Sequence, residues 1–308
     1  MVNEPTPTAQ PSADAFSVAD DPATGQIVVY GGTAGTGSDT WVWSGAGWAL
    51  ASPEMQPPPL AGASAVYDPV SRLVMIAGGG PFDGGGNDGT WAWDGKTWKE
   101  LDASTSQPPV AGGVMAWDPA LEQMILVTPA SPGDNSSSQT WLWVGNHWTP
   151  KGPHAPFEAN ALEMGFDPAT ESLLAVSCCL FSQSASSAGD EQVWRWDGVA
   201  WHLIADTALP SATGPLLGLS WDAASRSLLL CGQLFNPHSL PLMPVLMWRL
   251  VGHTWVAVRV ASAPSLSSGS LIQTNGGLRL VGADSTVEGN SSPYHVWAWT
   301  GSGWKQLG

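Results

Sequence analysis

The 308-residue sequence predicts an all-β protein, a six-bladed β-propeller whose blades each contain four antiparallel strands. Three observations predict this fold class: a repeat of about 50 residues, a composition with 19 Trp, 36 Gly and 26 Pro, and apolar runs with the length of strands. Few helix-length stretches lack a Gly or a Pro, so we expect no long helices.

A single tryptophan recurs once per repeat, with successive spacings of 50, 50, 53, 54 and 49 residues. A Trp-x-Trp pair or a close relative precedes it, and one glycine lies between the pair and the single Trp. Because Gly supplies the positive φ of a tight turn, this order predicts that the third and fourth strands form a hairpin. The single tryptophans are Trp48, Trp98, Trp148, Trp201, Trp255 and Trp304; the pairs are Trp41/Trp43, Trp91/Trp93, Trp141/Trp143, Trp194/Trp196, Trp248/Leu250 and Trp297/Trp299; the glycines are Gly45, Gly95, Gly145, Gly198, Gly252 and Gly301.

An Asp-Pro dipeptide or a relative lies upstream in each repeat, and a short apolar run follows it. Asp caps a turn and Pro presets φ at the next position, so the dipeptide predicts the turn between the first two strands. The apolar run predicts a second strand that is buried on both faces. The dipeptides are Asp21-Pro22, Asp68-Pro69, Asp118-Pro119, Asp167-Pro168, Asp222-Ala223 and Asn275-Gly276; the runs are Ile27–Tyr30, Leu73–Ala77, Met124–Val127, Leu173–Val176, Leu228–Cys231 and Leu278–Val281.

The second repeat illustrates the expected blade. Its first strand, Gly62–Tyr67, has mostly small residues, which suit an innermost strand that converges on the propeller axis with its counterparts. After the turn at Asp68-Pro69, we expect the remaining strands at Arg72–Ala77, Thr90–Trp93 and Trp98–Leu101. The two Trp of the third strand share one face because the side-chain period is two. They are expected to fill the space between blades, which widens away from the axis.

The repeats divide the whole chain. Residues 1–12 are polar and rich in Pro and Thr, so we expect a flexible lead-in, and residues 13–308 are expected to form the propeller. The first repeat begins with its innermost strand and the last ends with its outermost strand, so the ring should close without a shared (velcro) blade. The blades are expected at about 13–51, 60–102, 110–150, 159–205, 214–259 and 267–308.

This pattern of an apolar strand ending in Gly-Gly, an aromatic strand and a Trp that opens the last strand resembles the kelch family of β-propellers. That family includes the central domain of galactose oxidase. Gly31-Gly32 and Gly78-Gly79 carry the double glycine, which the later repeats lack. The resemblance covers nearly the whole chain and implies the fold, but this fold hosts enzymes and binding modules alike.

Two activities known in kelch propellers are not expected here. A galactose-oxidase copper site needs Tyr, His and a Cys-linked Tyr, but two of the three tyrosines fall in or beside predicted core strands. Sialic-acid mutarotases use polar residues around the channel. Five arginines are expected in strands or on the face with short turns, so an anionic sugar would find little positive charge at the channel mouth: Arg72, Arg226, Arg249, Arg259 and Arg279.

The formal net charge is −16, from 26 acidic and 10 basic residues. Nucleic-acid binding and docking on anionic membranes both need clustered basic residues, so the sequence disfavours both partner classes. No apolar run approaches the roughly 18–20 residues of a membrane span, so no membrane insertion is expected. The opening MVNEPTPTAQPS would suit a chain cut after a signal or anchor. We therefore expect a monomeric, extracytoplasmic bacterial protein, secreted or on the cell surface.

Three cysteines cannot form a disulfide framework, and none has the spacing of a zinc ligand. Cys178, Cys179 and Cys231 are expected to be free thiols, buried or half-buried. No cofactor is expected, although His and carboxylate side chains in the loops leave a divalent metal ion open as an alternative.

The connections between second and third strands are long, whereas the Asp-Pro and hairpin turns are short. We call the two sides of the disc the long-loop face and the short-turn face. Long loops on one side of a rigid scaffold are the usual seat of binding, so we expect the site on the long-loop face, at the mouth of the central channel. The candidate binding residues are Asp14, Asp83, Asp88, Asp134, His154, Asn160, Phe235, His238, Asp284, Tyr294 and His295.

Glu163 is the leading candidate for a chemical role, with Glu158 as a second, and the catalytic residues are otherwise unknown. Its counterparts in the other repeats, aligned by the Asp-Pro turn, are Ser17, Ser64, Val114, Gly218 and Leu271. A carboxylate among small and apolar counterparts is costly if it is buried alone. It binds a cation, acts as an acid or base, or is bonded to water or backbone amides in the channel.

The leading functional hypothesis is a non-catalytic binding module that engages a protein or a glycan through the long-loop face and the channel mouth. The alternative is a carbohydrate-active enzyme, a hydrolase, lyase or epimerase, with a channel-mouth carboxylate as acid or base. A third alternative is a structural unit of a larger exported assembly.

Overall fold

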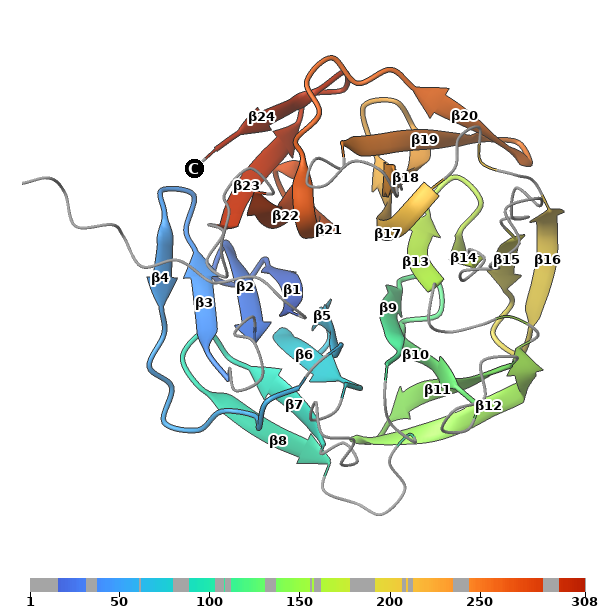
Figure 1. Ribbon diagram of the computed structural model, residues 1–308. Helices are drawn as coiled ribbons and strands as arrows, with labels where there is room; N and C mark the ends of the chain where they lie inside the picture. The colour runs from blue at the N-terminus through green and yellow to red at the C-terminus, as the bar shows by residue number, and fades with distance from the viewer. Residues whose placement is uncertain are drawn as a thin grey trace, which may run out of the picture.

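The computed structural model describes residues 16–31, 38–60, 62–79, 89–102, 108, 112–130, 137–155, 157, 162–177, 192–206, 209, 213–234, 244–284 and 294–307. The strands form six four-stranded antiparallel sheets that surround a central axis (Figure 1). The six-bladed all-β propeller predicted from the repeats is therefore confirmed. The described residues contain no helix long and apolar enough to cross a membrane.

Each blade is one contiguous stretch of chain whose strands pair in sequence order from the axis outward (Figure 1). Blades one to three consist of β1 (Phe16–Asp21), β2 (Gln26–Gly31), β3 (Thr40–Trp43), β4 (Trp48–Leu50); β5 (Ser64–Asp68), β6 (Leu73–Ala77), β7 (Thr90–Trp93), β8 (Trp98–Asp102); and β9 (Val114–Asp118), β10 (Gln123–Pro129), β11 (Ser138–Val144), β12 (His147–Ala155). Blades four to six consist of β13 (Leu162–Asp167), β14 (Ser172–Ser177), β15 (Gln192–Trp196), β16 (Trp201–Asp206); β17 (Thr213–Asp222), β18 (Ser227–Leu234), β19 (Val245–Val251), β20 (Thr254–Val258); and β21 (Leu266–Thr274), β22 (Gly277–Asp284), β23 (Tyr294–Trp299), β24 (Trp304–Gln306).

Four strand bounds in blade two differ from the expected ones: the first and second strands start later, and the first and fourth end one residue later, at Asp68 and Asp102. Gly62 has a φ of 67° and Arg72 a φ of 63°, outside the extended region of regular β-strands. The first strand therefore begins at Ser64 and the second at Leu73.

The Asp-Pro turns share one geometry. In blade two, the Asp68 carboxylate accepts the backbone N–H of Val70 at 2.9 Å and that of Ser71 at 3.2 Å, and the N–H of Arg72 donates to the Asp68 carbonyl at 2.7 Å. The fifth residue of the turn is left-handed in five blades. Blade one places a glycine there, whereas four blades place larger residues: Arg72, Glu122, Glu171 and Arg226.

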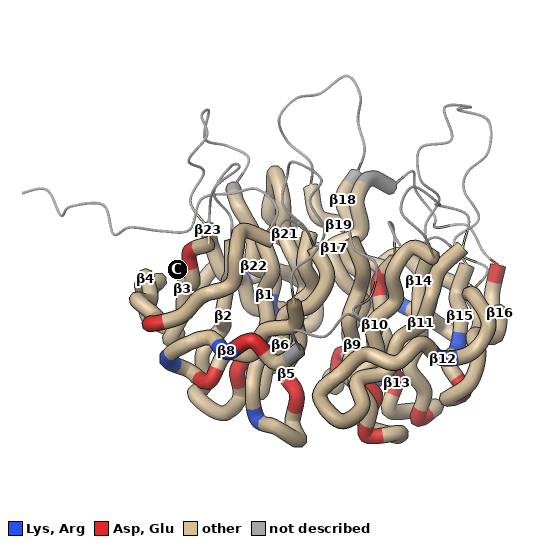
Figure 2. The backbone as a smooth tube through the Cα atoms, turned by 90° about the horizontal axis from the view of Figure 1, so that it is seen from below, with Lys and Arg blue, Asp and Glu red and all other residues tan. Residues whose placement is uncertain are grey.

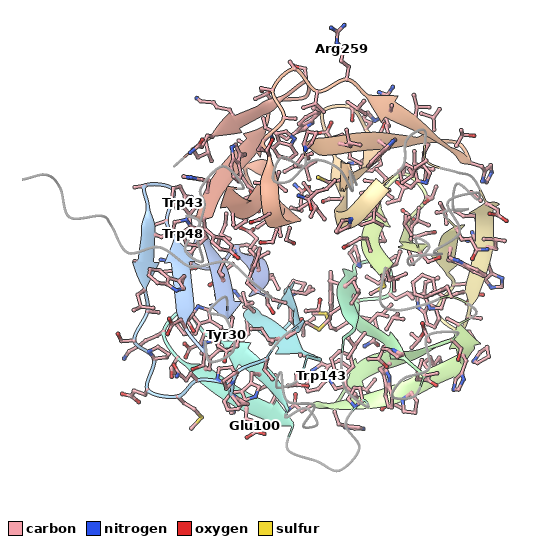
Figure 3. All side chains as sticks on the ribbon, viewed as in Figure 1. Tyr30, Trp43, Trp48, Glu100, Trp143 and Arg259 are labelled. Atoms are coloured by element: carbon pink, nitrogen blue, oxygen red, sulfur yellow. The ribbon has the colours of Figure 1, made fainter. Side chains whose placement is uncertain are left out.

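The core lies between the blades. The second strands are almost wholly buried, as their apolar runs predict. Farther out, the second Trp of each pair packs on the single Trp across the hairpin, with ring centroids 5.1 to 5.5 Å apart in five blades. Figure 3 labels one such pair, Trp43 and Trp48. Aromatic pairs at this spacing add stability beyond the area that they bury.

Hydrogen bonds from the single tryptophans connect neighbouring blades. Trp98 Nε1 donates to Thr40 Oγ1 of the preceding blade at 2.8 Å. Trp148 makes the same bond to Thr90 at 2.8 Å, and Trp201 to Thr140 at 2.9 Å. The threonine always directly precedes the Trp-x-Trp pair.

Blades one and six meet through side chains, without a strand shared between their sheets. Phe16 packs edge-on against Tyr294 at 4.8 Å, and Trp48 Nε1 donates to the Tyr294 carbonyl at 3.1 Å. Around them lies a cluster that includes Val29 and Val281, both fully buried. The expected closure without a velcro blade is confirmed.

Candidate functional site

A cavity of about 860 Å³ lies on the propeller axis, enclosed by the six innermost strands β1, β5, β9, β13, β17 and β21. Along β1 its lining extends from Phe16 to Pro22, and it covers matching stretches of the other five strands. Phe16 pairs with Gly31, where the connection to the third strand starts, so the Phe16 end faces the long-loop side. The cavity is therefore a channel that follows the axis from one face of the disc to the other.

Glu163 lines this channel near its long-loop end, on β13. Its counterparts in blades one and two reach the next blade: Ser17 Oγ donates to the Ala63 carbonyl at 2.7 Å, and Ser64 Oγ accepts the Met115 N–H at 3.0 Å. In blade five the matching residue is Gly218, which pairs with the fully buried Cys231 on β18. The charge of Glu163 contributes to raising the pKa of the Cys231 thiol, after burial as the main cause.

The carboxyl group of Glu163 has no hydrogen bond or ion pair to any other described residue. Desolvation alone raises its pKa from 4.5 to about 7. At neutral pH this group is thus close to half protonated, which is the condition for a proton donor or acceptor.

A ring of partly exposed side chains lines the channel near the short-turn face. Each occupies the position directly before the turn Asp or its Asn counterpart, so all six lie at one level. Four are aromatic, from four consecutive blades, and we call them the aromatic collar: Tyr67, Trp117, Phe166 and Trp221. Asp20 of blade one and Thr274 of blade six complete the ring.

Asp20 is the second carboxyl group of the channel. Its pKa is raised from 3.8 to about 6, chiefly by desolvation and then by the neighbouring charge of Asp21. The backbone N–H of Asn275 and the charge of Arg279 act in the opposite direction. No ion pair joins Asp20 to Arg279 within the described part of the chain.

The structure places only some of the candidate residues. Tyr294 and His295 lie in strand β23 and not in a loop. Tyr294 is fully buried at the junction of blades one and six, and His295 Nδ1 is 3.0 Å from Gln306 Nε2 of the outermost strand. His154 is exposed on the outermost strand of blade three, and Asp284 ends β22. Tyr294, His295 and His154 do not line the channel.

The other candidates lie outside the described residues, so the structure does not place the expected long-loop site: Asp14, Asp83, Asp88, Asp134, Glu158, Asn160, Phe235 and His238. Cys178 and Cys179 lie outside as well. No group of three or more His, Cys, Asp and Glu side chains is arranged for a metal ion within the described ranges.

The aromatic collar and Asp20 were not predicted from the sequence. The signal was present, because the residue before the turn Asp is aromatic in four repeats. An aromatic residue beside a predicted strand is most simply assigned to the core, and only the convergence of the innermost strands shows that these rings border a channel.

No family model matches the chain, and no curated protein matches its sequence. Among solved structures, the fold is similar to that of YjhT, with a TM-score of 0.62, 12% identity and 98% of each chain covered. It is also similar to AofleA from Arthrobotrys oligospora, with a TM-score of 0.58, 13% identity, and 96% of this chain and 85% of that chain covered. A variant of AofleA gives a TM-score of 0.62 at 13% identity, with 96% of this chain and 86% of that chain covered. At this identity the likeness concerns the fold alone, and it supports the kelch-type propeller.

Proposed function

We propose that this protein is a non-catalytic binding module that holds a protein or glycan ligand at the central channel mouth and the long-loop face. The observation that carries the proposal is the channel itself, a cavity of about 860 Å³ that combines aromatic and carboxyl side chains. Six innermost strands hold these side chains on a rigid frame. A preformed cavity with apolar walls and a few polar groups is the usual form of a ligand site.

The positions of the two channel carboxyls support binding over glycoside hydrolysis. Glycosidases place their two carboxyl groups about 5 to 9.5 Å apart. Glu163 lies four residues before its turn Asp and Asp20 only one, a difference of about 10 Å along a strand. They also belong to blades four and one, on opposite sides of the ring (Figure 1). This pair therefore does not have the separation of a glycosidase pair.

A carbohydrate-active enzyme with one acid or base is the second candidate. The pKa of about 7 at Glu163 favours it, because such a carboxyl group can gain and lose a proton at neutral pH. A lyase or an epimerase would use this group on a sugar bound at the long-loop mouth.

Thermal unfolding in the presence of mono- and oligosaccharides tests the proposal. A sugar at one hundred times its dissociation constant should stabilise the protein by about 2.7 kcal/mol. Glu163→Gln should weaken this stabilisation if the sugar contacts the channel. Glu100→Gln, on the exposed strand β8 (Figure 3), serves as the matched control and should leave it unchanged.

Proton NMR of each bound sugar then separates the two candidates. The binding module leaves the sugar unchanged over hours. Conversion of the sugar that is lost in Glu163→Gln would overturn the non-catalytic proposal and establish the enzyme. The absence of stabilisation by any sugar would remove the glycan and leave a protein ligand.

A further inference from the structure

We propose that the aromatic collar and Asp20 bind an organic cation, a quaternary or protonated amine, at the short-turn mouth of the channel. This mouth is at the opposite end of the channel from the long-loop face. The inference therefore goes beyond the function proposed above and can hold or fail without it.

Four aromatic side chains line the channel at one level. Tyr67, Trp117, Phe166 and Trp221 are each anchored on one side in a blade-to-blade cluster and partly exposed on the other. Rings held in this way lose little freedom when a ligand arrives. The face of an aromatic ring carries negative charge density, and it attracts a cation within about 6 Å of the ring centre.

The charges around the collar select a cation over other ligands that stack on aromatic rings. Among the described residues, the channel lining contains Asp20 and Glu163 but no Lys or Arg. Beyond the lining, the short-turn face carries both signs of charge, because Arg72 and Arg226 occupy the same turn position as Glu122 and Glu171, and Figure 2 shows Lys and Arg as well as Asp and Glu along this edge of the disc. The two carboxyl groups of the lining attract a cation and repel an anion, and a neutral sugar gains nothing from their charge.

Arg279 is the positive group that acts on the carboxyl group of Asp20, but it does not neutralise that group through an ion pair. The Arg279 guanidinium donates to the Leu278 carbonyl at 3.0 Å and forms no ion pair with Asp20 in the described structure. Thr274, the sixth member of the ring, is engaged in its own turn, where its hydroxyl donates to the Gly277 carbonyl at 2.9 Å. The carboxyl group of Asp20 is therefore the polar partner that the collar offers to a ligand.

A pair of ligands of equal shape tests the charge directly. Choline has a positively charged nitrogen where 3,3-dimethylbutan-1-ol has a neutral carbon. The dissociation constants of the two ligands are compared by calorimetry at pH 8. We expect choline to bind at least tenfold more tightly. Equal affinity would show a merely apolar or sugar-stacking pocket and would overturn the proposal, as would the absence of choline binding at 100 mM.

Two variants locate the site. Asp20→Asn should weaken choline binding at least threefold, and Trp117→Leu, which keeps an apolar side chain but removes the ring, should weaken it as well. Asp94→Asn removes an exposed turn carboxylate outside the channel and is the matched control. Choline binding that is unchanged in both channel variants would place the site elsewhere and overturn the proposal.

The pH dependence gives a further readout. Asp20, with a pKa of about 6, should lose its charge between pH 7 and pH 5, so choline affinity should fall over this range. Asp21 and Arg279 act on the same carboxyl group, and Glu163 lies in the same channel. Asp20→Asn should remove most of this dependence; a variant that keeps the full dependence would assign it to Glu163 and contradict the role of Asp20.

Discussion

Glu163 is a carboxyl group in a channel wall that offers it no hydrogen-bond donor among the described residues. Its counterpart in the next blade is Gly218, which pairs with the buried Cys231, and the charge of Glu163 acts on that thiol. The stability of the folded protein therefore depends on the protonation of this one side chain. A carboxyl group that is neutral in the folded state and charged in the unfolded state couples folding to pH.

Replacing Glu163 by Gln should flatten the pH dependence of stability. The folded pKa of about 7 exceeds the usual 4.5, so between these values the folded state binds more protons than the unfolded state. The contribution is full below about pH 4.5 and is lost as the pH rises through 7. In urea denaturation, the fall in unfolding free energy from pH 5 to pH 8 should be smaller in the variant, by on the order of 2 kcal/mol.

The variant retains Asp20, whose raised pKa acts in the same direction, so a smaller dependence should remain. Glu100→Gln, at an exposed position, should follow the wild type. Parallel curves for wild type and Glu163→Gln would show that the carboxyl group is charged in both states.

The position of a residue was predictable where one repeat differs from the others, and it was not predictable where burial decides. Alignment of the repeats identified Glu163 because its counterparts are small or apolar. Tyr294 and His295 were expected in a binding loop, but they extend β23 by pairing with Ala283 and Gly282. The collar was missed because a sequence does not show which side of an aromatic ring meets solvent.

At the scale of the blade, a threonine before the Trp pair and a tryptophan in the next blade form one recurring unit. Three blades lack the threonine, because Val193, Met247 and Val296 occupy its place. The indole N–H groups of Trp255 and Trp304, which would donate there, are buried without a hydrogen-bond partner in the described structure. Next to Val296, Trp48 of blade one donates to the Tyr294 carbonyl instead. The repeat pattern was visible in the sequence, but the partner of each indole was not, because the bond connects different blades.

Replacing Thr90 by Val should cost about 1 to 2 kcal/mol of unfolding free energy, because it leaves the Trp148 N–H buried and unpaired. Val193→Thr tests the same rule in reverse. It offers an acceptor to Trp255, so it should change stability by less than about 1 kcal/mol or increase it.

Val176→Thr is the control, since Val176 is fully buried in the same cluster as Val193 and Trp255. Its hydroxyl gains no such indole partner, and we expect a loss of about 1 to 3 kcal/mol. Equal losses at positions 176 and 193, measured by urea denaturation, would contradict the rule.

Across the whole molecule, the ring depends on a junction between blades one and six that no backbone connection spans. Tyr294 lies fully buried at its centre, with Phe16 against its ring and Trp48 bonded to its carbonyl. The closure without a shared strand followed from the sequence, because the first repeat starts and the last repeat ends with complete blades. The residues that seal it did not, since the contacts join opposite ends of the chain.

Tyr294→Ala should destabilise the protein by about 3 to 5 kcal/mol, as large aromatic truncations in cores do. Because every blade needs both neighbours to bury its faces, the loss should appear in one cooperative transition, with far-ultraviolet circular dichroism and tryptophan fluorescence coinciding. Leu50→Ala, on the outer strand where Leu50 is 51% exposed, should change stability by less than about 0.5 kcal/mol. Separate transitions for the two signals would show that the junction opens before the ring unfolds.

The confinement of each sheet to one contiguous stretch of chain also bears on how such a protein can change over generations. A DNA segment that encodes about 50 residues, from one Asp-Pro marker to the next, encodes four strands, as many as one sheet contains. Duplication or deletion of that segment alters the number of sheets without leaving any of them incomplete. A propeller closed by a velcro blade has an additional requirement. When its number of blades changes, strands from the two termini must still meet and pair in one sheet.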